Sequence, residues 1–436
     1  MHFCSTNSKD SIVSFKDAVL RCLPPDGGLY VPDRVMDMRQ FFLYMDDNIN
    51  YSELVATVAP SLLQGELNPF SAARVADSAF NFEPELLRLD DTFSILNLYK
   101  GPTGIFKDFG IAFLAAVLEE FYKNSGPAVV LSAARGDTGV SQAAAFNHRK
   151  GINLVLVYPS GQIRGLDKSN FVSNGGNIVP IQVEGTFDDC QRLITEAIND
   201  RPFAERYRIT SANAINPGRL LPQAFYYLYA FVKIKKYLSG DLVFSVPSGN
   251  FGNLIAGLYA WKFGMPVNGF VAAMNANNAF GDFIQGKPFV PRPLVNTNSP
   301  ALDVSMPSNY ERFASFYEEA PAVMRNLVFP ASVSDNMTMQ TIEQVWKKYG
   351  IQIDPHTAVG FAAAEKIAKS REWGCQVHTV VLATGHPAKE ADIIRKATGQ
   401  NITIPDNIVA LQNESEPLAK IPAHLNAFEA VIASCL

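Results

Sequence analysis

The residue of this sequence whose setting most favours chemistry is a lysine placed between aromatic side chains. Lys107 follows Phe106 and precedes Asp108 and Phe109 in the run GPTGIFKDFG, residues 101–110. An apolar setting disfavours the charged ammonium and lowers the pKa of a lysine. Such an amine is nucleophilic, and its usual partner is a carbonyl compound, with which it forms a Schiff base. The alternative is a surface lysine beside a turn that pairs with Asp108.

A glycine-rich loop follows the apolar strand expected at 242–246 and precedes an expected helix that ends near residue 263. Glycines let the backbone approach an anion, which free N–H groups and the positive end of the helix dipole then hold. The loop lacks the Lys-Ser/Thr ending of a P-loop, and the chain has no GxGxxG, so a nucleotide is disfavoured. The alternative is a plain turn. We expect a phosphate to contact Gly249, Asn250, Phe251, Gly252 and Asn253.

A third loop follows the apolar strand expected at 376–383 and opens with Thr384, whose hydroxyl is a neutral partner for a ring nitrogen. A Schiff-base lysine, a phosphate cup and this hydroxyl together indicate pyridoxal 5'-phosphate as the cofactor. His356 and His386 are not spaced as a metal pair, so no metal site is expected.

Composition places the chain among globular proteins. Of its 436 residues, 47% are hydrophobic and 18% are charged. The net charge of -5 does not favour binding to nucleic acid or to an anionic membrane. The five cysteines form no CxxC, which disfavours a disulfide framework or a zinc site. Neither a secretory signal nor an apolar run of the ~18 residues that span a membrane is present. We therefore expect a cytoplasmic protein.

The pattern of elements predicts an α/β fold. From about Phe93, apolar strands alternate with helices, which is typical of doubly wound parallel sheets with both faces covered. Ligands of such sheets bind at the carboxyl ends of the strands, where all three loops lie. Further strands are expected at 128–133, 153–158 and 178–183, and helices at 111–123, 140–148 and 187–199. The first ninety residues read as a mainly helical unit with Ser14 as a helix N-cap, and 285–310 as a surface excursion.

Four runs carry a family resemblance. They are GPTGIFKDFG, RGDTG at 135–139, SVPSGNFGN at 245–253 and ATGHPAK at 383–389. In this order they resemble the motifs of the bacterial and fungal threonine synthases, within the tryptophan-synthase-β-like group of pyridoxal phosphate enzymes. The resemblance extends from about residue 12 to residue 400.

The resemblance implies a fold type II enzyme with two doubly wound lobes and an N-terminal, mainly helical domain. We expect the N-terminal domain at 1–90, a large cofactor domain at 91–131 and 214–400, a small mobile lobe at 132–213 and a C-terminal tail at 401–436. The implied enzyme is a carbon–oxygen lyase that converts O-phospho-L-homoserine and water to L-threonine and phosphate, with Lys107 as cofactor lysine and as general acid and base. The residues implied to border the substrate are Asp137, Thr138, Asn213, Asn216 and Arg219.

The sequence also departs from the family pattern. Ala134-Arg135 stand where a hydroxyl residue usually precedes GDTG, Lys100 replaces a histidine, and Gly385 and Glu390 differ around HPAK. Lys100 and Arg135 add cations that suit the anion of a phosphorylated amino acid. Two alternatives remain. One is a related phospho-lyase acting on another anionic amino acid, which the Arg135 loop distinguishes from a threonine synthase. The other is a non-catalytic binding or regulatory protein, disfavoured by the intact Lys107. Either a monomer or a homodimer is expected.

Overall fold

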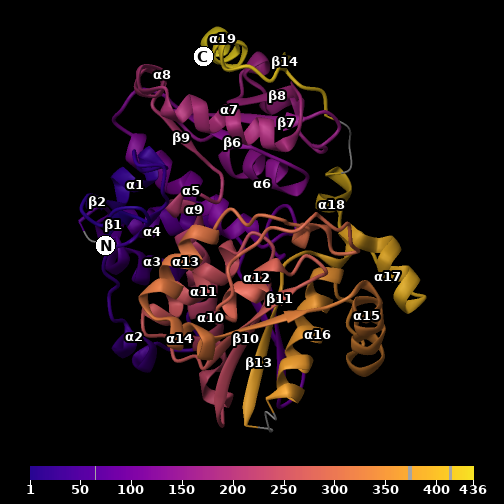
Figure 1. Ribbon diagram of the computed structural model, residues 1–436. Helices are drawn as coiled ribbons and strands as arrows, with labels where there is room; N and C mark the ends of the chain where they lie inside the picture. Colours follow the sequence, from indigo (N-terminus) through magenta and orange to yellow (C-terminus); the bar gives the residue numbers. More distant parts are fainter. Residues whose placement is uncertain (64, 372–375, 412–414) are drawn as a thin grey trace.

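The computed structural model describes residues 1–63, 65–371, 376–411 and 415–436. Figure 1 shows a five-stranded lobe above a larger six-stranded one, with the N-terminal domain (indigo) at the side of both. Throughout the described ranges, no helix is long and apolar enough to cross a membrane. Cys4, Cys22, Cys190 and Cys435 are free thiols, and Cys375 lies outside the described residues.

The N-terminal domain combines helices with a small antiparallel sheet. Ser14 caps the first helix by accepting a hydrogen bond from the Asp17 N–H, as predicted. Among the strands of this sheet, the sequence predicts the one near Tyr30 and not the other two. The strands, in the order β2-β1-β3, are β1 (His2–Ser5), β2 (Val13–Ser14) and β3 (Tyr30–Pro32). The helices are α1 (Phe15–Arg21), α2 (Arg39–Tyr44), α3 (Tyr51–Leu62) and α4 (Pro69–Ala79).

The large sheet has the strand order β12-β11-β10-β13-β5-β4. Its strands are β4 (Glu85–Arg88), β5 (Phe93–Asn97), β10 (Asp241–Pro247), β11 (Gly269–Met274), β12 (Val328–Ser332) and β13 (Val377–Ala383). All neighbours pair in parallel except β4, which runs antiparallel to β5. The predicted parallel α/β architecture is therefore confirmed. Helices α10 (Ala224–Ile234), α11 (Gly252–Lys262) and α16 (Pro355–Ser370) pack around this sheet.

The small lobe has a parallel sheet of order β14-β8-β7-β6-β9. Its strands are β6 (Ala128–Ala133), β7 (Ile152–Pro159), β8 (Ile178–Glu184), β9 (Ile209–Ser211) and β14 (Ala419–Pro422). Its helices are α6 (Asp137–Phe146), α7 (Phe187–Asn199), α8 (Arg201–Tyr207) and α19 (Leu425–Cys435).

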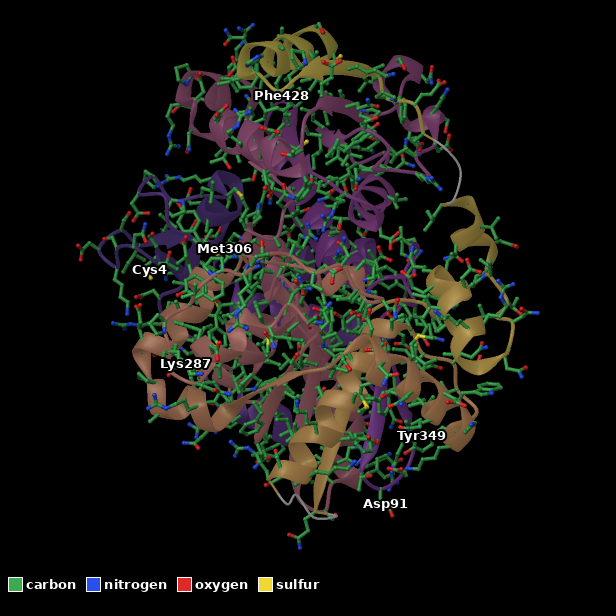
Figure 2. All side chains as sticks on the ribbon, turned by 45° about the vertical axis from the view of Figure 1, so that its right-hand side comes forward. Cys4, Asp91, Lys287, Met306, Tyr349 and Phe428 are labelled. Carbon is green, nitrogen blue, oxygen red and sulfur yellow. The ribbon has the colours of Figure 1, made fainter. Side chains whose placement is uncertain are left out.

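Two predicted boundaries differ from this arrangement. The sequence predicts that the first large-domain segment ends at residue 131, but β6 hydrogen-bonds to β7 and β9 of the small lobe and so belongs to its sheet. The expected C-terminal tail at 401–436 is also part of this lobe, because β14 extends the sheet beside β8. Phe428 of α19, labelled at the top of Figure 2, is fully buried against the small-lobe core.

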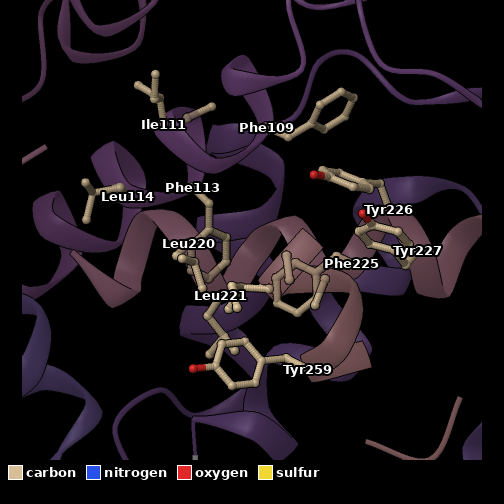
Figure 3. Packing of buried hydrophobic residues seen from close by; sticks show 14 of the residues in the cluster. Phe109, Ile111, Phe113, Leu114, Leu220, Leu221, Phe225, Tyr226, Tyr227 and Tyr259 are labelled. Atoms are coloured by element: carbon tan, nitrogen blue, oxygen red, sulfur yellow. The ribbon is translucent and has the colours of Figure 1, made fainter. Parts of the chain in front are cut away.

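Helix α5 (Lys107–Tyr122) begins four residues earlier than the sequence predicted, at the lysine itself. It is buried on nearly all sides, and in Figure 3 its aromatic residues face those of α10, with Phe113 and Phe225 at a centroid distance of 5.6 Å. The excursion at 285–310 is largely exposed, although Leu302 at the end of its 3-10 turn, Pro300–Leu302, is buried. The other helices are α9 (Pro217–Leu220), α12 (Ala279–Ile284), α13 (Tyr310–Glu319), α14 (Pro321–Leu327), α15 (Asp335–Tyr349), α17 (Ala391–Thr398) and α18 (Asp406–Ala410).

Candidate active site

Lys107, the first residue of α5, points its amine at the small lobe. Its Nζ donates to the Thr138 Oγ1 at 3.0 Å. The side chain keeps part of its surface accessible, yet the packing around it is dense enough that loss of solvation lowers the pKa of Lys107 to about 8. The positive charge of Arg219 is the next largest cause of this lowering. The expected pKa shift at Lys107 is therefore present in the structure.

Asp108 does not pair with the lysine, so the alternative of an ordinary surface ion pair is wrong. Its Oδ2 accepts from the Thr103 N–H at 2.9 Å, and its Oδ1 accepts from the hydroxyls of Thr103 at 2.6 Å and Ser141 at 2.5 Å. Burial raises the pKa of this carboxyl. Asp108 thus joins the turn before α5 to α6, a role that no local sequence pattern indicates.

The loop at 248–253 joins β10 to α11, as predicted. Phe251 has the left-handed backbone conformation, with φ 60° and ψ 0°. Within the described ranges, the N–H groups of Gly249, Asn250 and Phe251 donate to no protein acceptor. The first turn of α11 leaves further N–H groups free at the same place. These donors form a cup of the kind that binds phosphate.

The side chains of Asn253 and Thr384 offer polar atoms to a ligand near this cup. Asn253 is buried; its Oδ1 accepts from Tyr226 at 2.6 Å and Tyr227 at 2.8 Å, whereas its Nδ2 meets no acceptor among the described residues. Thr384 directly follows β13, which lies beside β10, and its carbonyl accepts from the Phe106 N–H at 2.9 Å, next to Lys107. Because buried polar groups are normally paired, the orphaned amide marks a place for a ligand. Lysine, cup and hydroxyl meet at the carboxyl ends of β10 and β13 and fit pyridoxal phosphate.

Three cations surround the amine of Lys107, and the charge of each lowers its pKa. Arg219 is buried; its Nη1 donates to the Ala212 carbonyl at 2.6 Å, its Nε finds no partner within the described chain, and burial lowers its pKa to about 10. Arg135 is exposed and lies over the ring of Phe187, 5.4 Å from the centroid. Lys389 is the third.

Lys389 was missed as a site residue, although it lies in the ATGHPAK run. Its Nζ is 2.9 Å from the Oδ1 of Asp137, at the start of α6. Thr138 therefore contacts Lys107 directly, and Asp137 pairs with Lys389, whose charge acts on Lys107. Lys389 ends the same run that contains Thr384, and its place in that run was the signal that would have identified Lys389.

Three other predicted substrate residues have partners within the protein. Asn216 is fully buried and caps α9, and its Nδ2 donates to the backbone carbonyls of Val19 and Ser211, so both amide hydrogens already have acceptors within the protein. The Asn213 Oδ1 accepts from the Ala133 N–H at 3.0 Å, and the Asn213 Nδ2 donates to the Ala133 carbonyl at 2.7 Å. Lys100 forms an ion pair with Glu85 at 2.8 Å.

The two histidines that are not spaced as a metal pair, His356 and His386, form hydrogen bonds within the protein. The Nδ1 of His356 lies 2.5 Å from the Oδ2 of Asp354, and its Nε2 accepts from the Ala301 N–H at 3.2 Å. The Nδ1 of His386 accepts from the Ala388 N–H at 3.1 Å. Among the described residues, no group of three His, Cys, Asp or Glu side chains is placed to hold a metal ion.

Comparison with known proteins identifies the family and the cofactor class. The family model for pyridoxal-phosphate dependent enzymes matches residues 90–385, and models for the threonine synthase N terminus and C-terminal region match 2–80 and 357–432. A threonine synthase of Serratia marcescens is 34% identical over 396 residues, which cover 90% of each chain. The crystal structure of threonine synthase from Escherichia coli superposes with a TM-score of 0.86, at 30% identity and full coverage of both chains. The pyridoxal-phosphate-bound threonine synthase from Brucella melitensis gives 0.87 at 26% identity, with 100% of this chain and 99% of that chain covered.

The fold and the site define a pyridoxal-phosphate-dependent lyase of fold type II, which confirms the predicted fold and cofactor. Within that class, the chain belongs to the threonine synthase family.

Proposed function

We propose that this protein converts O-phospho-L-homoserine and water to L-threonine and phosphate. The observation that carries this proposal is the set of charges around Lys107: Arg219, Arg135 and Lys389 all act on one amine of lowered pKa. A substrate with a carboxylate and a phosphate needs cations on two sides, and arginine suits both groups because its donors match their oxygens. The names of the relatives support the same reaction.

The cofactor contacts follow from the groups that the protein leaves unpaired. The loop N–H groups and the Asn253 Nδ2 would hold its phosphate, Lys107 its carbonyl carbon, and Thr384 its ring nitrogen. When bound, pyridoxal phosphate supplies an electron sink for negative charge on the substrate carbons.

Lys107 is the group that moves protons in this proposal. A general acid and base works best with a pKa close to the working pH, and the pKa of about 8 at Lys107 meets this condition. Thr138 orients the amine through its 3.0 Å contact. In our assignment, Lys107 removes one proton from Cα and one from Cβ, and phosphate leaves from Cγ. A proton is then delivered to Cγ, water adds its hydroxyl at Cβ, and a proton returns to Cα, so that threonine and phosphate are the products.

The anion contacts divide between the two lobes. Arg219 is fixed by its bond to the Ala212 carbonyl and is assigned to the substrate carboxylate, because a buried cation without a counter-ion is best compensated by a bound anion. Arg135 and Lys389 are assigned to the phosphate. The small lobe contributes Arg135 and Thr138, so its closure would exclude water until addition is due.

The decisive experiment is to incubate the holoenzyme with O-phosphohomoserine and to measure both phosphate and the amino-acid product. Equal amounts of phosphate and threonine are expected. Phosphate without threonine would support the related phospho-lyase, and no phosphate with intact cofactor binding would support a non-catalytic protein. Borohydride should attach the cofactor to Lys107, and a Lys107→Ala variant that is still labelled would refute that assignment. The cytoplasmic location and the choice between monomer and homodimer stay predictions.

A further inference from the structure

Arg312 of α13 is a fully buried cation whose partners are neutral. Its Nε donates to the Tyr30 carbonyl at 3.0 Å, and its Nη1 donates to the Ala214 carbonyl at 3.1 Å. It forms no ion pair within the described chain. Burying an arginine is expensive unless its donors are satisfied, and here carbonyl oxygens satisfy them. Arg312 thus ties the N-terminal strand β3 to the segment by which the chain leaves the small lobe.

The same guanidinium fixes a side chain that contacts the phosphate loop. Its Nη1 also donates to the Asn309 Oδ1 at 2.7 Å, and the Asn309 Nδ2 donates to the Asn250 carbonyl at 3.2 Å. Because Arg312 carries donors alone, it determines which end of the Asn309 amide faces the loop. The Ser308 N–H, donating to the Asn250 Oδ1 at 3.1 Å, holds the other end of Asn250.

This contact acts on the strained part of the loop. Phe251 has φ 60°, which is unfavourable for a bulky residue and persists only where surrounding contacts hold it. In a trans peptide, the carbonyl of one residue and the N–H of the next point in opposite directions. Holding the Asn250 carbonyl toward Asn309 therefore turns the Phe251 N–H to the other side, where it has no protein acceptor among the described residues.

We propose that Arg312 is a positioning residue for the cofactor phosphate. Through Asn309 it holds the peptide between Asn250 and Phe251 in the orientation that binds an anion. Because Arg312 also binds the Tyr30 carbonyl, it makes the docked N-terminal domain a requirement for tight cofactor binding. This proposal depends on the assignment of residues 249–253 as the phosphate site.

The test compares pyridoxal phosphate with pyridoxal, which lacks the phosphate but forms the same bond to Lys107. Dissociation constants are measured by absorbance on the full-length chain after removal and return of the cofactor. Asn309→Ala and Arg312→Lys should each raise the Kd for pyridoxal phosphate about tenfold, as expected for the loss of one hydrogen bond at a charged group, and change the Kd for pyridoxal at most about threefold. The ³¹P resonance of the bound cofactor should shift in both variants.

A matched control is an arginine that also joins the N-terminal domain to the rest of the chain, away from the loop. Arg149 donates from Nη2 to the Ser78 carbonyl at 3.0 Å and pairs with Glu119 at 2.9 Å. Arg149→Met should lower the melting temperature and leave the ratio of the two dissociation constants unchanged. If Arg312→Lys does not fold, Asn309→Ala still decides, because it keeps the Arg312 bonds to the backbone.

If Asn309→Ala raises the Kd for pyridoxal phosphate and the Kd for pyridoxal by the same factor, the proposal is overturned and the role of this contact is merely structural. Failure of the phosphate site itself gives a different result. In that case the unaltered protein would bind pyridoxal as tightly as pyridoxal phosphate, and the proposal would fail together with the site. If Gly252→Val abolishes the preference for pyridoxal phosphate and Asn309→Ala does not, the site stands and Arg312 has no part in it.

Discussion

The Nζ of Lys389 lies 2.9 Å from the Oδ1 of Asp137, which precedes it by 252 positions. Asp137 begins α6 in the small lobe, and Lys389 lies in the turn after β13 of the large sheet. The Asp137 side chain is 48% exposed, so this ion pair is partly solvated and contributes little to stability. An inter-lobe contact of this kind can open and close easily.

We therefore predict that a substrate analogue protects the small lobe from exchange. Hydrogen exchange with and without the analogue should show slower exchange within 132–213, because closure brings α6 onto the site. In Lys389→Met the amides of α6 should exchange faster without ligand, since the contact with Asp137 is lost. Unchanged exchange of this span on ligand binding would contradict the predicted closure.

The reactivity of Lys107 should follow a pKa of about 8 rather than the 10.5 of a free lysine. The neutral amine is the nucleophile, so the rate of cofactor attachment to the apoenzyme should rise with pH and level off above pH 8. Removing the neighbouring charge in Arg219→Met should shift this midpoint upward, because a nearby cation disfavours the ammonium. Stopped-flow absorbance across the pH range measures both midpoints, and a wild-type midpoint near 10.5 would contradict the lowered pKa.

The two loop glycines should respond differently to alanine. A Cβ on Gly249 would lie 2.7 Å from the Ala301 carbonyl oxygen, whereas one on Gly252 would lie 3.5 Å from the Asn309 Nδ2, an ordinary contact. Gly249→Ala should therefore lower both the melting temperature and the cofactor affinity. Gly252→Ala should fold normally and lose affinity about tenfold, because its methyl group obstructs the phosphate. Full cofactor occupancy of Gly252→Ala at low cofactor concentration would place the cup elsewhere.

Arg135 should contribute to substrate binding. A charge-assisted hydrogen bond to phosphate is worth about 1.5–3 kcal/mol, so Arg135→Ala should raise KM for O-phosphohomoserine about tenfold or more. Phe187→Leu, which removes the ring under the guanidinium, should give a smaller increase. Arg135→Ser should recover part of the loss through its hydroxyl. If Arg135→Ser instead creates threonine synthase activity that the unaltered protein lacks, the proposed substrate is wrong.

Local patterns predicted the reactive parts of the molecule. Lys107 between aromatic residues, the glycine loop after an apolar strand, and Thr384 at a strand end are all readable within about ten residues, because strand, loop and helix signals are short-range. Their convergence followed from the parallel sheet, whose strand ends meet at one edge. For the same reason the strands at 128–133, 153–158 and 178–183 lie where the sequence placed them, to within a residue or two.

Contacts between distant residues decided the rest. The sequence could not show that β14 extends the small-lobe sheet, that the Asn216 side chain donates to backbone carbonyls, or that Lys389 pairs with Asp137. The bond from Arg312 to the Tyr30 carbonyl spans 282 positions, and an arginine in an amphipathic helix has the same local pattern whether it meets solvent or a carbonyl. The sequence by itself determined which groups can do chemistry, since residue type and local conformation set that. Tertiary structure alone decided which charges surround them, because a hydrogen bond or ion pair depends on distance in space and leaves no periodic signal along the chain.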